Sequence, residues 1–254
     1  DDGLLKAIGR IHGRSEIEQA IESIARAGLE NYNLVLMYAL PGQSVDSAEE
    51  DIRLALAAGS THLSLYQLTL EPNTALHASP PVLPNEDAAW EMQQACASHV
   101  SDAGMENYEI SAWCRPGRAC RHNLNYWEYG DFLGIGAGAH GKLTLPAEGA
   151  VRRLIRQRHP RTWMEGAVRG DSIVENRVVD SGERVFEFFL NQLRLRGGVR
   201  KSMFTPRTGL SWKSVEDRVE ELVARGLLEE RDERLVPTEI GWRFVNEIQA
   251  VFLP

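Results

Sequence analysis

The feature that most constrains this chain is the alternation of helix-patterned segments with short apolar runs over its first 140 residues. Apolar residues recur at helical spacing in three segments, 17–25, 52–58 and 88–99. Short apolar runs, typical of buried strands, lie at 33–38, 62–68, 105–110 and 132–137. This order predicts an α/β fold with a parallel sheet and right-handed crossovers. Ligands of such sheets bind at the carboxyl ends of the strands.

The rest of the chain has a different pattern. Residues 181–254 read as two helices, a hairpin turning near Asp232 and Glu233, and a last helix, which is the order of a winged helix. Residues 146–180 are rich in arginine and less regular. The sequence therefore predicts three parts: a barrel-like part at 1–145, a linker at 146–180 and a helical, winged-helix-like domain at 181–254.

Charge disfavours a nucleic-acid partner. The net charge is -8, and the second helix of the winged-helix pattern, 214–225, carries four acidic residues against two arginines. Facing phosphates with that surface is costly, so we expect a domain that caps the fold or covers a ligand. No run reaches the roughly 20 apolar residues of a membrane helix. Three irregularly spaced cysteines make no disulfide framework, which indicates a reducing cytoplasm.

The segment from Tyr108 to Gly141 holds most of the chemically distinctive residues. It brings together arginines, histidines, aromatics and glycines: Arg115, Arg118, Arg121, His122, Tyr126, Trp127, Gly134, Gly136, Gly138 and His140. Guanidinium groups pair with carboxylates, a neutral imidazole is a common heme ligand, and aromatic rings pack on flat ring systems. The segment therefore predicts a flat, anionic, metal-binding ligand such as heme or a porphyrin.

The glycine run allows two interpretations. Gly134, Gly136 and Ala139 match a relaxed dinucleotide fingerprint, but His140 and Gly141 would begin the required helix poorly. We favour a strand end at which the backbone approaches a ligand closely, with Gly136 and Gly138 in contact with it.

The possible metal ligands also have plainer interpretations. Cys114, Cys120, His122 and His140 match no standard zinc spacing, so the thiols are interpreted as incidental and Cys96 as core. Either histidine could be structural. The arginines could form a solvated loop with ion pairs to nearby Glu128 and Asp131.

Several stretches together resemble the oxygen-independent coproporphyrinogen III oxidase-like proteins and, within them, the heme chaperone branch. They are LKAIGRIH at 5–12, NLVLMYALPGQS at 33–44, HLSLYQLTLEPNT at 62–74, YEIS at 108–111, RHNLNYW at 121–127 and GIGAGAHG at 134–141. The HNxxYW motif is specific to the chaperone branch. The resemblance implies that its histidine, His122, binds heme iron.

The resemblance also implies a fold and cofactors. The fold is a partial parallel (β/α) barrel of the radical S-adenosylmethionine type, followed by a small helical domain. Tyr66 and Gln67 would line its S-adenosylmethionine pocket. Members hold a [4Fe–4S] cluster through a CxxxCxxC loop, which this chain lacks. That loop is expected upstream of residue 1, and without that part the parallel sheet would have an unpaired edge.

Two residues depart from the family pattern. Its strand typically reads Asp-Leu-x-Tyr-Gly-Leu-Pro, whereas Val35 stands at the aspartate position and Ala39 at the glycine position. The aspartate is expected to contact S-adenosylmethionine, and valine offers no acceptor. The sequence therefore predicts impaired binding of this cofactor.

Three functions stay open at this point. The first is a heme-binding protein that delivers heme to apoproteins. In it His122 is the iron ligand, Arg121, Arg115 or Arg118 pairs with propionates, and Tyr126 and Trp127 pack on the macrocycle or brace the loop. The second is oxidative decarboxylation of coproporphyrinogen III, with the cluster supplied by other sequence. The third is a degenerate family member without a cofactor.

Overall fold

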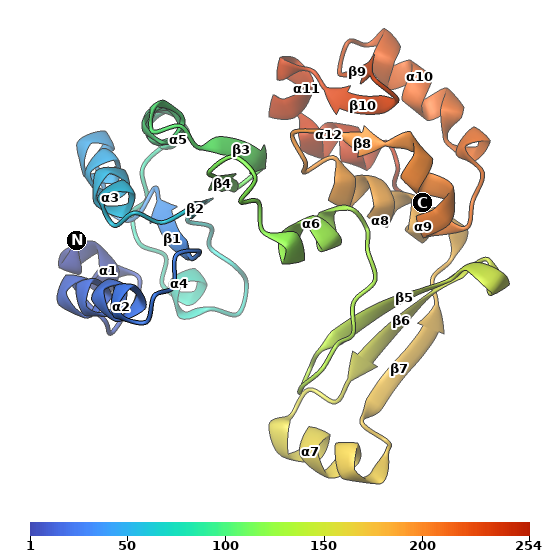
Figure 1. Cartoon of the computed structure of the whole chain (residues 1–254), viewed down its shortest axis with the longest axis horizontal. Helices are drawn as coiled ribbons and strands as arrows, with labels where there is room; N and C mark the ends of the chain where they lie inside the picture. Colours follow the sequence, from blue (N-terminus) through green and yellow to red (C-terminus); the bar gives the residue numbers. More distant parts are fainter. The chain divides into compact units, whose positions relative to one another are not determined.

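The computed structural model describes all 254 residues and divides into two compact units, Asp1–Cys120 and Arg121–Pro254 (Figure 1). The division falls after Cys120, whereas the sequence predicted a boundary at 145. Residues 146–180, predicted as a linker, contain two strands and a helix and belong to the second unit. No helix combines the length and apolar character that crossing a membrane requires.

The first unit is a four-stranded sheet with helices. Its elements are α1 (Asp2–Ala7), α2 (Arg14–Arg26), β1 (Asn33–Tyr38), α3 (Val45–Ala57), β2 (His62–Gln67), α4 (Ala75–Ala78), α5 (Glu86–Asp102), β3 (Glu106–Glu109) and β4 (Ala112–Cys114). The sheet order is β1-β2-β4-β3. β1 and β2 are parallel as predicted, but β4 runs antiparallel to both β2 and β3. The prediction of an all-parallel sheet is therefore wrong beyond the first pair.

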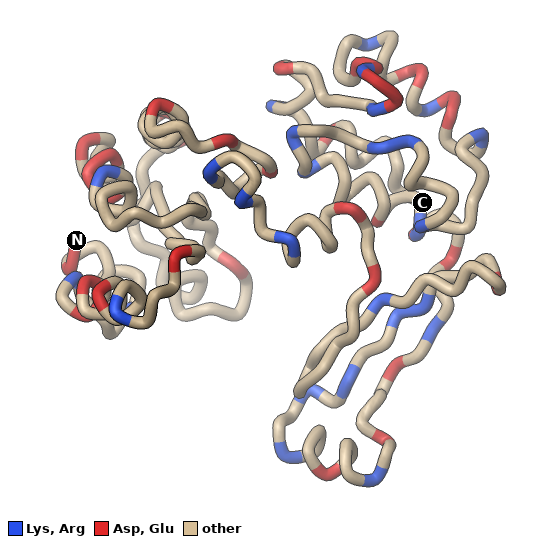
Figure 2. Tube along the Cα trace, in the orientation of Figure 1, with Lys and Arg blue, Asp and Glu red and all other residues tan.

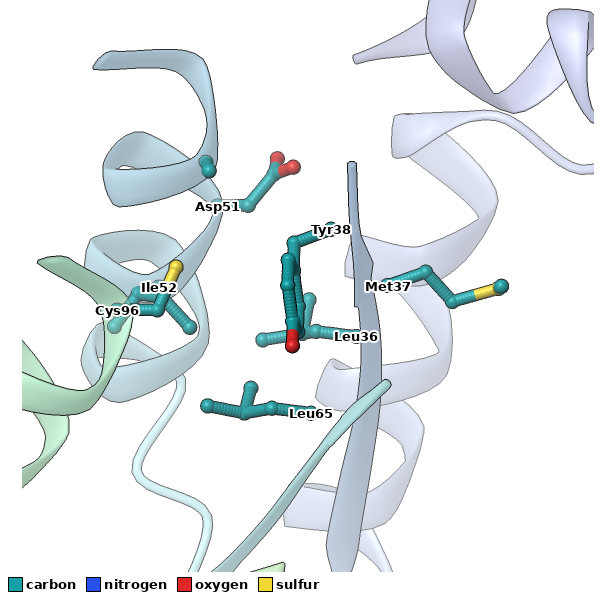
Figure 3. A pocket seen from close by; sticks show the side chains of 8 residues that line it. Leu36, Met37, Tyr38, Asp51, Ile52, Leu65 and Cys96 are labelled. Atoms are coloured by element: carbon teal, nitrogen blue, oxygen red, sulfur yellow. The ribbon is translucent and has the colours of Figure 1, made fainter. Parts of the chain in front are cut away.

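The core of this unit lies between the sheet and helices α3 and α5. Leu36 and Tyr38 of β1 point toward Ile52 of α3 and Cys96 of α5, whereas Met37 points to the opposite face (Figure 3). This alternation is the two-residue period of a strand. β1 lies at the edge of the sheet, and its Val35 is 61% exposed.

Helix starts follow capping chemistry. Asn85 caps α5, accepting a hydrogen bond from the Ala88 N–H. Ser44 caps α3, and its hydroxyl accepts a hydrogen bond from the Ser47 N–H. α2 begins after Gly13, whose N–H is bound by the Glu16 carboxylate, so Ser15 lies inside the helix instead of capping it.

The second unit begins with a short helix and an antiparallel sheet. Its first elements are α6 (Arg121–Trp127), β5 (His140–Leu145), η1 (Pro146–Glu148), β6 (Ala150–Arg156), α7 (Pro160–Arg169) and β7 (Ile173–Val178). The sheet order is β5-β6-β7. The predicted strand at 132–137 is wrong, because only Phe132 pairs there, in a single antiparallel bridge with Lys142. Figure 2 shows basic residues along this sheet.

The C-terminal part of the unit contains the hairpin predicted near Asp232 and Glu233, with more short elements around it than the sequence indicated. It comprises α8 (Ser181–Gln192), β8 (Val199–Arg200), η2 (Lys201–Met203), α9 (Phe204–Thr208), η3 (Trp212–Ser214), α10 (Glu216–Ala224), β9 (Leu228–Arg231), β10 (Arg234–Pro237), α11 (Glu239–Arg243) and α12 (Val245–Ala250). Its strands pair antiparallel in the order β8-β10-β9.

Aromatic packing holds this C-terminal part together. Phe188, Phe189, Phe204 and Phe252 are each fully buried, and the rings of Phe189 and Phe252 stack with centroids 3.7 Å apart. The hairpin turns at Asp232 and Glu233, both with positive φ, as predicted. Acidic residues gather along α10 and β9 (Figure 2).

Candidate functional site

Helix α6 carries the HNLNYW motif and presents its histidine to solvent. His122 and Tyr126 lie four residues apart and therefore share one helix face. The His122 imidazole is exposed and meets the Tyr126 ring edge-on, with centroids 4.8 Å apart. The Tyr126 ring in turn packs on Phe132, with centroids 4.4 Å apart. The rings of His122, Tyr126 and Phe132 thus lie in a continuous row, called the aromatic row below.

Trp127 faces another part of the unit. The guanidinium of Arg194, just beyond the end of α8, lies 4.3 Å from the centroid of the Trp127 ring. The indole Nε1 is buried without a hydrogen-bond partner. Trp127 therefore packs α6 against the end of α8.

The glycine segment is shaped by the chain's own backbone. A Cβ at Gly134 would lie 2.2 Å from the carbonyl oxygen of His140, so only glycine fits there. Gly136 and Gly138 have φ values of 116° and 68°, in the region that glycine adopts freely. Just before Gly136 the segment exposes two apolar side chains, with Leu133 72% and Ile135 78% exposed.

The predicted arginines do not all belong to one compact unit. Arg121 is exposed at the start of α6 in the second unit. Arg115 belongs to the first unit, where its Nη1 donates to the carbonyl of Ala103 at 2.7 Å and so helps to cap the end of α5. Arg118 is exposed in the same unit. Asp131, one of the two carboxylates with which the arginines could pair, forms an ion pair with Lys142.

Tyr66 and Gln67 end β2 and are both exposed. As consecutive strand residues they point to opposite faces of the sheet. Ala39, at the position where the family pattern has glycine, adopts a positive φ of 57° and is 2% exposed. The backbone therefore keeps the conformation for which glycine is suited, although alanine occupies it.

The cysteines do not form a cluster site. Cys96 and Cys114 are buried in the first unit, and all three thiols are free. Burial raises the pKa of the Cys96 thiol to about 11 and also raises that of Cys114. No group of three or more histidine, cysteine or acidic side chains could hold a metal ion. The residues of this chain therefore do not fit a [4Fe–4S] cluster.

Sequence reasoning missed the polar residues beneath α6. Asn125, Asp131, Lys142 and Thr144 connect the helix to β5 through hydrogen bonds. Nothing local in the sequence marks Lys142 as buried, since lysine is almost always exposed.

Comparison with known proteins gives one consistent result. Residues 179–244 match the model of the HemN C-terminal domain. The heme chaperone HemW of Escherichia coli is 41% identical over 249 residues, which cover 98% of this chain and 65% of that protein. HemW of Haemophilus influenzae is 39% identical, covering 100% and 65%. HemW of Bacillus subtilis is 30% identical, covering 100% and 67%.

The fold agrees with a solved structure. Coproporphyrinogen III oxidase (HemN) from Escherichia coli, a radical SAM enzyme, superposes with a TM-score of 0.75 at 14% identity, over 99% of this chain and 61% of that one. The chain is thus α/β with a HemN-like fold, and it spans 65% of the length of the first two relatives. It belongs to the coproporphyrinogen III oxidase-like family, in its HemW heme chaperone branch.

Proposed function

We propose that this chain is the heme-handling part of a heme chaperone, which binds heme through His122 and passes it to heme-receiving apoproteins. The observation that carries the proposal is the aromatic row, which begins on α6 and whose exposed end is the imidazole of His122. Imidazole is a common axial ligand of heme iron, and an exposed one is open to ligand exchange. The relatives named heme chaperones support the same conclusion.

Each neighbouring residue then has a role. Arg121, next to His122, pairs with a heme propionate. Tyr126 offers an aromatic face to the macrocycle, and Trp127 braces the helix from behind. The segment with Gly136 and Gly138 brings exposed apolar side chains and bare backbone to the ligand's edge. The free thiols support a reducing location, and we propose the cytoplasm.

The radical chemistry of the wider family is a separate question. Tyr66 and Gln67 remain proposed contacts of S-adenosylmethionine, at an exposed strand end in the first unit. Because the cysteines here do not fit a cluster, oxidative decarboxylation of coproporphyrinogen III would need ligands from other sequence. No contact in the structure favours that second function.

A heme titration tests the proposal. Hemin is added to the unaltered chain, to His122→Ala and to His159→Ala, which removes another exposed histidine of the same unit. We expect saturable binding with a shifted Soret band in the unaltered chain and in His159→Ala. The shift should be lost in His122→Ala.

Two outcomes would count against the proposal. An unchanged Soret shift and affinity in His122→Ala would show that another group ligates the iron. No saturable binding by any of the three proteins would favour a degenerate member that keeps the fold alone.

A further inference from the structure

Lys142 is a buried lysine directly beneath the segment that follows α6. Its side chain on β5 is 1% exposed. The ammonium donates to the Tyr129 carbonyl at 2.8 Å, to Asp131 Oδ1 at 3.1 Å and to Thr144 Oγ1 at 3.0 Å. It also lies 3.9 Å from the centroid of the Tyr129 ring. All three N–H donors of the ammonium are therefore used, as a buried charge requires.

Asp131 carries this connection into α6. Its carboxylate accepts the Thr144 N–H at 3.0 Å, while its backbone carbonyl accepts Asn125 Nδ2, from α6, at 2.9 Å. The Gly130 N–H donates to the Asn125 carbonyl at 2.7 Å. A Cβ at Gly130 would lie 2.2 Å from Asn125 Oδ1, so the chain folds back tightly on the helix end.

Tyr129 fixes the same segment from the other side. It has a left-handed φ of 54° and is 2% exposed. Its hydroxyl donates to Glu187 Oε2 of α8 at 2.6 Å, and Glu187 forms an ion pair with Arg153 of β6 at 2.7 Å. The residues after α6 are thus held by β5, β6 and α8 together.

A short path of contacts leads from Lys142 to His122. The backbone of Lys142 exchanges both of its hydrogen bonds with Phe132, at 3.0 Å each. The Phe132 ring packs on Tyr126, and the Tyr126 ring packs on His122. Lys142 therefore holds Phe132 in place through backbone hydrogen bonds, and it holds Tyr129 and Asp131 in place through its ammonium group.

We propose that Lys142 is a positioning residue for His122: through Tyr129, Asp131 and Phe132 it fixes the ring of Tyr126, against which the imidazole rests. The helix needs such a support, because seven residues are too few to be stable alone. This inference rests on the proposed function, since it assigns His122 the ligand role, and it adds a residue of β5 to that site.

The first test needs no heme. In the unaltered chain the imidazole Hε1 signal of His122, assigned by its loss in His122→Ala, should be displaced by the ring current of Tyr126. Lys142→Met should move this signal toward the value of a free histidine, while Lys201→Met, which removes a lysine paired with Glu230 in the same unit, should leave it unchanged. An unmoved signal in folded Lys142→Met would overturn the inference.

The second test uses hemin as the probe. We expect Lys142→Met to weaken hemin binding about tenfold or more, the usual effect of losing a group that orients a ligand. If Lys142 acts through His122, the double variant His122→Ala/Lys142→Met should bind no more weakly than His122→Ala alone. Additive losses would show that Lys142 acts elsewhere and would overturn the inference.

A further variant and the pattern of outcomes keep the conclusions separate. If Lys142→Met does not fold, Asn125→Ala removes the link to Asp131 while leaving the buried lysine in place, and the same two readouts apply. If His122→Ala binds hemin as the unaltered chain does, the proposed function is refuted. If His122→Ala loses the Soret shift while Lys142→Met and Asn125→Ala leave both readouts unchanged, only the positioning role of Lys142 is refuted.

Discussion

Raising the pH from 7 to 9.5 should stabilise the second unit through Lys142. Burial lowers the pKa of this ammonium from 10.5 to about 8, and the opposing attraction of Asp131 is too weak to restore it. Arg207 and Arg153 lower it further. Between the two pKa values the unfolded chain binds a proton that the folded chain has released. Stability due to this group therefore rises with pH in that window.

The size of the effect follows from the pKa shift. Each pKa unit is worth about 1.4 kcal/mol, so the lowered pKa of Lys142 corresponds to about 3 kcal/mol in total. Integrated from pH 7 to 9.5, about 2 kcal/mol of this is recovered. The buried ammonium is thus costly at neutral pH, which agrees with a role in positioning and not in stability.

Urea unfolding of the unaltered chain and Lys142→Met at both pH values measures the effect. Other buried groups act in the opposite direction: burial raises the pKa of Cys96 to about 11 and that of Tyr38 to about 12. These contributions are common to both proteins and cancel in the difference. From pH 7 to 9.5, we expect the free energy of unfolding of the unaltered chain to rise by about 2 kcal/mol more than that of Lys142→Met. Equal pH slopes in the two proteins would refute the argument.

Three further predictions concern the two cores. Burial lowers the pKa of His62 below 6.5, so on acidification the unfolded chain takes up a proton before the folded chain does. The stability of the first unit should therefore decrease as the pH falls below about 6.5. His62→Gln should make this decrease less steep in acid titrations followed by circular dichroism. Gly241→Ala should cost about 3 kcal/mol in urea unfolding, because its Cβ would lie 1.8 Å from the Leu227 carbonyl oxygen. Gly226→Ala, with open space around it but a φ of 68°, should cost only about 1 kcal/mol, and an equal cost at both glycines would contradict the steric reasoning. Phe189→Ala should cost about 4 kcal/mol by the same measurement, since it removes a fully buried ring stacked on Phe252, and a loss below about 1 kcal/mol would refute that packing.

Hydrophobic period predicted the longer helices and the first two strands of the first unit, but not the direction of its later strands. The helices around 17–25, 52–58 and 88–99 and the strands β1 and β2 were all predicted. β3 was predicted as another parallel strand, because its apolar run looks the same in either direction. Only Ile110 and Ser111 separate it from β4, with no glycine or proline to indicate a turn. A hairpin was therefore not evident from local chemistry.

The sheet β5-β6-β7 was missed for a related reason. Arg152, Arg153 and Arg156 lie within β6, where their charge reads as a solvated linker. The structure accounts for them by partners far along the chain: Arg153 pairs with Glu187 of α8, and Arg156 donates to the carbonyl of Gly134. Sequence windows cannot show such partners. The same limit hid Lys142, whose acidic partner lies 11 residues away across a bend.

Within the candidate site, contacts between neighbours on one helix could be predicted from the sequence, whereas contacts to distant elements could not. His122 and Tyr126 could be identified from one short motif, because their contact follows from helical spacing. The residues that hold α6 in place could not be identified in this way, since they lie on β5 and α8 and in the segment after α6. This division suits a heme carrier: the side chain that would meet the iron is exposed on a marginal helix, while the groups that orient it are buried. Under the proposed function, release of heme would exchange only an exposed imidazole, and the buried support would stay in place.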